Sequence, residues 1–205
     1  MDNVERKLTV FDQVSTPDKV RKKIIDAASV LYAKRGFAAT SIEEISQMAG
    51  VDPVVTATYV ETKSEIMRMI MEDVLSIFQE NLSTMIKGID DPQEKLAVAA
   101  NIYFKVVDQQ SEKALLIYQK SGSLDKASKS RVMQLEVDVS SIFAKIISEG
   151  IDQGVFRRVD VDLMAYNILL MAHMWVLKKW HFKNRLTHER YYKLQLENIL
   201  AALKV

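Results

Sequence analysis

Few side chains in this chain of 205 residues have the types and spacing that catalysis or metal binding requires. The sequence contains no cysteine, which excludes thiolate zinc sites, disulfides and a cysteine nucleophile. His173, His181 and His188 have no histidine or carboxylate partner at metal-ligand spacing. No glycine-rich phosphate loop or nucleophile motif is present. We therefore expect neither an enzyme nor a protein with a metal or cofactor.

A second group of residues is suited to binding an apolar ligand. Methionine and aromatic side chains are dense in the second half of the chain, and flexible methionines adapt to ligands of varied shape. A basic cluster that includes Lys183 and Arg185 follows, and it is suited to an anionic head group. Core packing and a solvated helix end explain the same residues without a ligand. The predicted ligand-binding residues are Phe104, Tyr118, Met171, Met174, Trp175, Lys178 and Lys179.

The composition favours helices as the elements that position these residues. The chain is 48% hydrophobic and has only three prolines and six glycines, few for the many turns of a sheet. The first sixteen residues lack the apolar core of a signal peptide, and the longest apolar run, at 168–177, is too short to cross a bilayer. We expect an all-α, cytoplasmic protein that does not enter a membrane.

Capping residues and apolar spacing place the helices. Thr16 and Pro17 begin the first, and capping boxes at Ser41 with Glu44 and at Thr62 with Glu65 begin two more. Further helices are predicted at 92–107, 112–121, 125–149, 161–182 and 188–203.

The stretch GVDPVVTATYVETKSE at 50–65 gives two conflicting signals. Its β-branched residues alternate as in a strand, whereas Asp52 followed by Pro53 is a typical helix start. A strand between two short helices would have no partner for its backbone hydrogen bonds. We therefore predict a helix over 53–60.

Three short helices, the second and third joined by AGVD, form a helix-turn-helix pattern. The run from Ile25 to Ile66 resembles the TetR family of bacterial transcriptional regulators, through IIDAASVLYAKRGFAATSIEEISQMAGV and YVETKSEI. Farther on, LIYQKSGSLDKASKSRV, EGIDQGVFR and WVLKKWHF resemble the branch that often responds to acyl-CoA thioesters. The resemblance implies an N-terminal helix-turn-helix DNA-binding domain and a C-terminal helical domain for ligand binding and dimerisation.

The same resemblance implies which residues contact DNA, although the third helix departs from the family pattern. Tyr59 and Lys63 match family positions that contact phosphates, and the tyrosine usual at position 57 is replaced by Ala57. The helix has no Arg, Lys, Asn or Gln to read bases, which leaves threonine hydroxyls and contacts with thymine methyl groups. For Tyr59, packing within its own domain is as good an explanation as a contact with phosphate. The predicted DNA-binding residues are Thr40, Val54, Val55, Thr56, Thr58, Tyr59 and Lys63.

The last two long helices carry the predicted dimer interface. The helix at 161–182 is apolar on two faces and therefore needs neighbours on both. One face can pack in its own domain and the other on a twofold mate, in a four-helix interface. The alternative is that both faces lie in the core of a monomer. The predicted interface residues are Tyr166, Leu170, Leu177, Leu196, Ile199 and Leu203.

These patterns predict a homodimeric repressor that a small molecule, an acyl-CoA thioester for example, releases from a palindromic operator. The expected domains are a flexible segment at 1–15, a helix-turn-helix domain at 16–71 and a ligand-binding and dimerisation domain at 72–205. The alternative is a TetR-like ligand-binding or protein-interaction module with weak or lost operator binding. Residues 1–71 hold ten cations and ten carboxylates, so their charge does not by itself indicate nucleic-acid binding.

Overall fold

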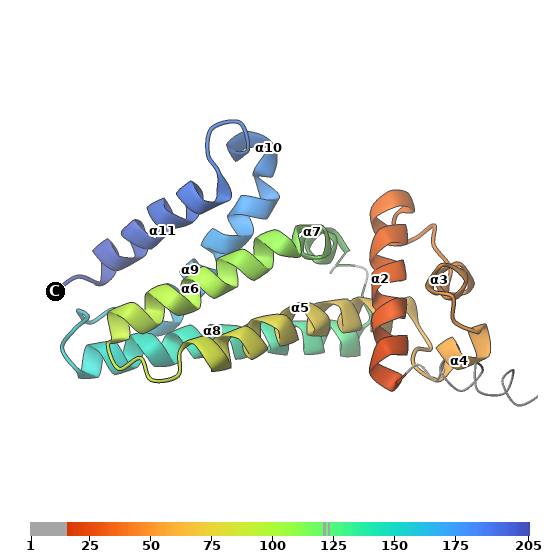
Figure 1. The fold of residues 1–205 in the computed structure, drawn as a ribbon, viewed down its shortest axis with the longest axis horizontal. Coiled ribbons are helices and arrows are strands. Elements are labelled where there is room, and N and C mark those ends of the chain that lie inside the picture. The colour runs from red at the N-terminus through yellow and green to blue at the C-terminus, as the bar shows by residue number, and fades with distance from the viewer. Residues whose placement is uncertain (1–15, 121, 123) are drawn as a thin grey trace, which may run out of the picture. The chain divides into compact units, whose positions relative to one another are not determined.

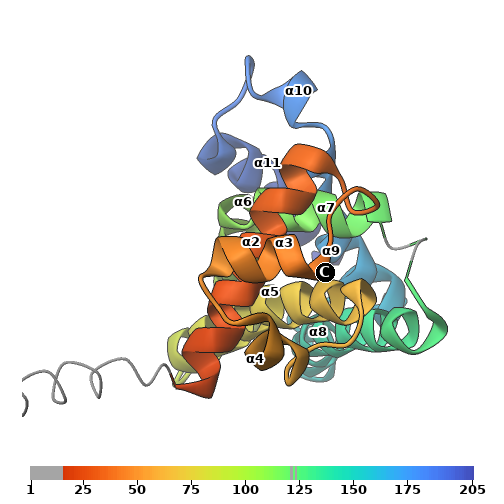
Figure 2. The same ribbon diagram turned by 90° about the vertical axis from the view of Figure 1, so that its right-hand side faces the viewer.

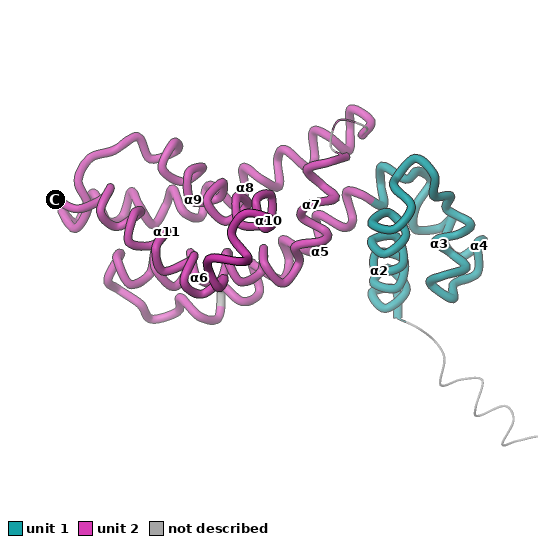
Figure 3. Tube along the Cα trace, turned by 90° about the horizontal axis from the view of Figure 1, so that it is seen from above, with its two compact units in different colours: residues 1–66 teal, residues 67–205 magenta. Residues whose placement is uncertain are grey.

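A computed structural model of the chain describes residues 16–120, 122 and 124–205, and it contains helices and no strand in these ranges. The predicted all-α class is thereby confirmed. The chain divides into two compact units, residues 1–66 and 67–205, which Figure 3 shows in different colours. The predicted flexible segment at 1–15 lies outside the described residues. No helix in the described ranges is long and apolar enough to cross a membrane.

In residues 16–66, the described part of unit 1, there are three helices and the start of a fourth (Figures 1 and 2): α2 (Pro17–Arg35), α3 (Ile42–Ala49), α4 (Pro53–Ala57) and α5 (Lys63–Met85), which continues into unit 2. The predicted capping box at Ser41 is present, because its hydroxyl accepts from the Glu44 N–H and the Glu44 carboxylate accepts from the Ser41 N–H. Gly50 follows α3 in the left-handed conformation, with φ of 61°, which glycine adopts without strain. This turn brings α4 against α3.

The helix predicted over 53–60 is shorter in the structure and ends at Ala57. Asp52 begins it by accepting a hydrogen bond from the Val54 N–H at 2.7 Å, as the sequence predicted. Beyond Ala57, the Thr58 N–H bonds to the Val55 carbonyl at 3.0 Å, three residues back, and the Thr58 hydroxyl donates to the same oxygen at 2.7 Å. These bonds end the helix, and residues 58 and 59 form a turn.

The described residues of unit 2 form the rest of α5 and six further helices, which Figure 1 shows as an elongated bundle. They are α6 (Pro92–Gln109), α7 (Ser111–Lys120), α8 (Lys126–Asp152), α9 (Val161–Leu177), α10 (Lys179–Phe182) and α11 (His188–Leu203). Helices α6, α8 and α9 pack on one another, and α11 packs on α6 and α9.

Aromatic rings join the long helices of unit 2 at its centre. Phe78 of α5 contacts Tyr103 of α6 edge-on at 5.0 Å between ring centres, and Tyr103 contacts Phe143 of α8 in the same way at 5.7 Å. Such pairs contribute about 0.5–1.5 kcal/mol beyond the burial of their surface. All three rings are buried, so this cluster fixes the mutual placement of α5, α6 and α8.

Two helix ends in unit 2 differ from the prediction. Helix α8 continues through Gly150 to Asp152. A Cβ atom at position 150 would lie 2.2 Å from the ring of Phe156. This glycine therefore makes room for a neighbouring ring rather than ending a helix. The helix predicted over 161–182 is interrupted at Lys178, which separates α9 from the single turn of α10.

Candidate functional site

The exposed surface of α4 is the first candidate site, because the sequence places it at the recognition position of a helix-turn-helix. Val54 is 77% exposed and Val55 is 41% exposed, and Ala57 and Thr58 are exposed beside them. Thr56 does not belong to this surface. It is fully buried, and its hydroxyl donates to the Asp52 carbonyl at 3.2 Å, so the prediction that Thr56 faces outward is corrected.

Lys63 was predicted to contact a phosphate, and the structure places its ammonium group elsewhere. The Nζ atom donates to the backbone carbonyls of Phe37 at 2.8 Å, Ala38 at 3.1 Å and Thr40 at 2.9 Å. A lysine ammonium has three N–H donors, and all three are taken. It also lies 5.0 Å from the centre of the Phe37 ring. In this structure Lys63 holds the start of α5 to the loop between α2 and α3, with no donor left for a phosphate.

Two further predicted DNA-binding residues, Thr40 and Tyr59, differ in their burial. Thr40 is buried, and its hydroxyl donates to the Gly36 carbonyl at 2.9 Å, which corrects the prediction that this hydroxyl is available to DNA. Tyr59 is half-buried. Two carboxylates, Glu43 and Glu61, line the same shallow hollow as Thr40 and Lys63. The hollow is therefore a poor place for a phosphate.

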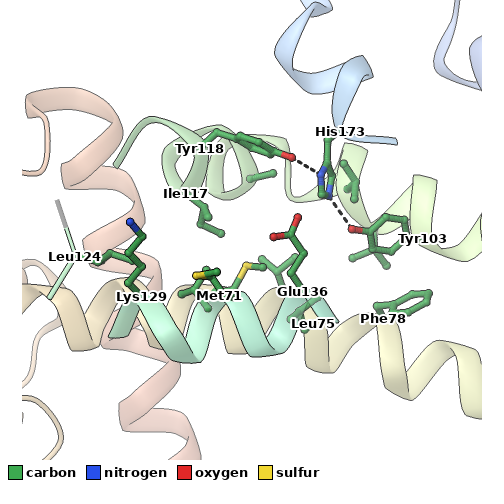
Figure 4. A pocket seen from close by; sticks show the side chains of 16 residues that line it. Met71, Leu75, Phe78, Tyr103, Ile117, Tyr118, Leu124, Lys129, Glu136 and His173 are labelled. Carbon is green, nitrogen blue, oxygen red and sulfur yellow. Dashed lines mark hydrogen bonds between the residues drawn. The ribbon is translucent and has the colours of Figure 1, made fainter. Parts of the chain in front are cut away.

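A cavity of about 210 Å³ in unit 2 is the second candidate site (Figure 4). It lies between α5, α6, α7, α8 and α9 and is mostly apolar, and its polar groups come from five side chains. Its apolar lining consists of Met71, Val74, Leu75, Phe78, Val106, Val107, Ala114, Ile117, Leu124, Val132 and Met133. Its polar lining consists of Tyr103, Tyr118, Lys129, Glu136 and His173.

His173 closes one end of the cavity between two tyrosines, as Figure 4 shows. Its Nε2 atom lies 2.7 Å from the hydroxyl of Tyr103, and its Nδ1 atom lies 2.5 Å from the hydroxyl of Tyr118. A neutral imidazole has one N–H and one acceptor nitrogen, so one hydroxyl donates to the ring and the other accepts from it. Burial lowers the pKa of His173 to about 4, which keeps the ring neutral at pH 7.

Two further titratable groups face the cavity. The Glu136 carboxyl points toward the end of the cavity that His173 occupies, and burial raises its pKa. Burial and the nearby Glu136 also raise the pKa of Tyr118 to about 12. Lys129 lies beside Leu124, away from His173. The cavity thus combines an apolar middle, hydrogen-bonding groups at one end and a cation at the other.

Of the predicted ligand-binding residues, only Tyr118 lines this cavity. Phe104 instead packs on Tyr192 of α11 at 5.5 Å, and Trp175 packs on Tyr191 at 5.2 Å. The Trp175 indole N–H also donates to the Asp108 carboxylate at 2.7 Å. Met171 and Met174 are half-buried against the core of unit 2. The structure thus places these four residues outside the lining of this cavity.

The two predicted lysines do not line the cavity either. Lys178 is exposed at the end of α9, and Lys179 lies 3.6 Å from Asp108 in a partly exposed ion pair. The cation of the cavity is Lys129, which the sequence reading missed together with Tyr103 and Glu136. The sequence gives little indication of Lys129 and Glu136, because a single lysine or glutamate on a helix is typical of a solvent-exposed face.

An apolar surface on α9 is the third candidate site. Leu163 is 61% exposed and Leu170 is 51% exposed, while the predicted interface residues Tyr166, Leu177 and Leu196 are half-buried. Ile199 and Leu203 were predicted to face a partner, but both are buried in the core of unit 2. The reason is helical phase: on α11 they lie on the face that packs toward α6 and α9.

Comparisons with known proteins agree with the two-unit arrangement. Residues 24–55 match the family described as bacterial regulatory proteins, tetR family, and residues 89–183 match the tetracyclin repressor-like C-terminal domain. The chain is 28% identical over 191 residues to the HTH-type transcriptional regulator HbdR of Aromatoleum sp. (strain CIB), covering 93% of this chain and 83% of the relative.

It is also 24% identical over 176 residues to the HTH-type transcriptional repressor KstR2 of Rhodococcus jostii (strain RHA1), covering 83% of each. Among solved structures, AibR in complex with isovaleryl coenzyme A and operator DNA has a similar fold. Its TM-score is 0.71 and its identity 20%, over 87% of this chain and 97% of that one.

Proposed function

This chain belongs to the TetR family of bacterial transcriptional regulators, and from that premise we propose that it is a ligand-responsive repressor. Unit 1 binds operator DNA through α4, and unit 2 binds a small effector in the cavity that His173 closes. The observation that carries the proposal is this cavity, in a chain whose other unit is a helix-turn-helix. Bound effector lowers the affinity for DNA. The protein acts in the cytoplasm as a regulator and not as an enzyme.

The cavity supports the acyl group of a coenzyme A thioester as effector. Its volume of about 210 Å³ exceeds the roughly 150 Å³ of an engineered cavity that binds benzene. This volume is enough for an aromatic ring or a short acyl chain. Lys129 supplies a cation for a phosphate-bearing head group. The similar AibR was solved with isovaleryl coenzyme A, which supports the same class of ligand here.

The exposed apolar surface of α9 supports a homodimer. Leu163 and Leu170 expose large apolar side chains, and a helix that is apolar all round needs neighbours on both sides. Two copies paired through this surface present two copies of α4 to a palindromic operator, whose half-sites lie about 34 Å or a multiple apart.

A second function, ligand binding with weak or lost operator binding, is favoured by one observation in unit 1. Lys63 has no free donor, and the carboxyl groups of Glu43 and Glu61 line the same hollow. Hydrogen bonds from its own backbone and from Ser41 lower the pKa of Glu43, so it is charged at neutral pH. Carboxylates at this place repel a phosphate backbone.

One experiment separates the two functions. The DNA upstream of the protein's own coding sequence is titrated with protein at several salt concentrations, with and without a panel of short-chain and aromatic acyl-CoA thioesters. A repressor shifts this DNA with a steep negative salt dependence and releases it on addition of one thioester. A ligand-binding module without operator binding shows no shift, while a thioester still raises its melting temperature by mass action.

A further inference from the structure

The exposed side chains of α4 present methyl groups to whatever binds there. Val54 and Val55 are 77% and 41% exposed, and the exposed methyl group of Ala57 lies on the same short helix. These residues supply no hydrogen-bond donor and no acceptor from their side chains.

The side-chain hydrogen-bond donors of Thr56, Thr58 and Lys63 are used within unit 1. The Thr58 hydroxyl donates to the Val55 carbonyl at 2.7 Å, and Thr56 is buried. At the other end, the Asp52 carboxylate accepts from the Val54 N–H at 2.7 Å. The Lys63 ammonium is held by three carbonyls. Direct reading of guanine requires donors to N7 and O6, and adenine is read by a donor to N7 together with an acceptor for N6.

We infer that α4 selects its operator through the 5-methyl groups of thymine in the major groove. This inference rests on the proposed function, because it assumes that α4 enters DNA. The thymine methyl is the base-edge group whose recognition needs an apolar contact rather than a hydrogen bond. Val54, Val55 and Ala57 offer that contact, and burying methyl against methyl removes apolar surface from water on both sides.

The test removes the methyl groups from the DNA and leaves its other groups in place. A binding duplex is first selected from a random pool with the full-length protein. It is then synthesised with deoxyuridine at the selected thymines, which keeps base pairing and the O4 acceptor. Affinity should fall about fourfold for each methyl group that α4 buries, whereas the salt dependence should not change, because no phosphate contact is lost.

A protein variant locates the contact on α4. The Val54→Ala variant should bind the thymine duplex more weakly, and deoxyuridine should then weaken it less than it weakens the unmodified protein. Val30→Ala is the matched control, because Val30 is also an exposed valine of unit 1 but lies on α2. It should keep the full response to deoxyuridine.

Each outcome decides one question. Equal affinity for thymine and deoxyuridine duplexes overturns the inference and leaves operator binding intact. Binding without any selected sequence overturns it as well, because no base is then read. If the folded protein binds no duplex at low salt, the proposed DNA-binding function itself fails. Deoxyuridine placed at thymines outside the selected positions controls for effects on DNA shape.

Discussion

The ammonium group of Lys63 lies 2.8 Å from the carbonyl oxygen of Phe37 and 5.0 Å from the centre of the Phe37 ring. Together with the bonds to Ala38 and Thr40, this contact joins residues more than twenty positions apart in the sequence. The lysine therefore acts within unit 1 as a clamp on the loop that precedes α3.

Replacing Lys63 by alanine should destabilise unit 1. Three carbonyls lose a charged donor, and a hydrogen bond to a charged group contributes about 1.5–3 kcal/mol. The side chain is only half-buried, so water can hydrogen-bond to the carbonyls that lose the lysine. We therefore expect the free energy of unfolding to fall by about 2 kcal/mol. Urea unfolding measures it.

The matched control is Lys23→Ala, since Lys23 is exposed in the middle of α2. It should change the free energy of unfolding by less than about 0.5 kcal/mol. The DNA affinity of a stably folded Lys63→Ala protein is also measured at several salt concentrations. If its salt slope is smaller by about one unit, Lys63 does contact a phosphate, as the family resemblance implies.

The stability of unit 2 should depend on pH through His173. Burial lowers its pKa in the folded protein to about 4, below the ordinary value of 6.5. Between these values the unfolded chain binds a proton that the folded protein does not. The contribution of His173 to the free energy of unfolding is therefore fully present above pH 6.5. It is lost as the pH falls toward 4, at up to about 1.4 kcal/mol per pH unit.

Urea unfolding at pH 7, 6 and 5 tests this dependence. The His173→Gln variant lacks the titrating ring and should lose less stability over the same range. Glu136 faces the same cavity, and its raised pKa has the opposite effect on the pH dependence, because it reduces stability as the pH rises above 4.5. The difference between the two proteins therefore isolates His173. Parallel curves would show that its pKa is not lowered.

Local sequence signals were sufficient for most of the helices. The capping boxes at Ser41 and Thr62 form as predicted, and α11 spans the predicted 188–203. Such signals depend on neighbours within one turn, so a single sequence reveals them. The end predicted at residue 149 was wrong, because Gly150 makes room for the ring of Phe156 and does not end the helix. The spacing of residues in the sequence does not show that contact.

The cavity was harder to predict because it depends on helical phase. Tyr103 lines it and the adjacent Phe104 does not, and the same holds for His173 and the nearby Trp175. Adjacent residues on a helix point about 100° apart, and only the packing of the neighbouring helices decides which face is hollow. The sequence did not predict the three backbone contacts of Lys63 for a related reason, since the carbonyls converge on it only in the folded unit.

Filling the cavity should separate effector binding from DNA binding. Ala114 lines the cavity from α7, so the ring of an Ala114→Phe variant takes up volume that the effector needs. The variant should bind operator DNA as the unmodified protein does, but no thioester should release it or raise its melting temperature. Gel shift and thermal unfolding measure the two effects.

Val137→Phe is the control, because Val137 is exposed on α8 and does not line the cavity. It should respond to the effector normally. An Ala114→Phe protein that still releases DNA with the same thioester would place the effector outside this cavity.

A charge at Leu170 should break the homodimer without unfolding the protomer. Leu170 is 51% exposed on α9, so an aspartate there stays solvated in a monomer but is buried without a partner in a dimer that uses this surface. Sedimentation should show monomers for Leu170→Asp and dimers for Leu115→Asp, in which a partly exposed leucine of α7 is changed instead. Leu203→Asp should unfold unit 2, because Leu203 is buried in its core. An unmodified chain that sediments as a monomer at micromolar concentration would exclude the dimer altogether.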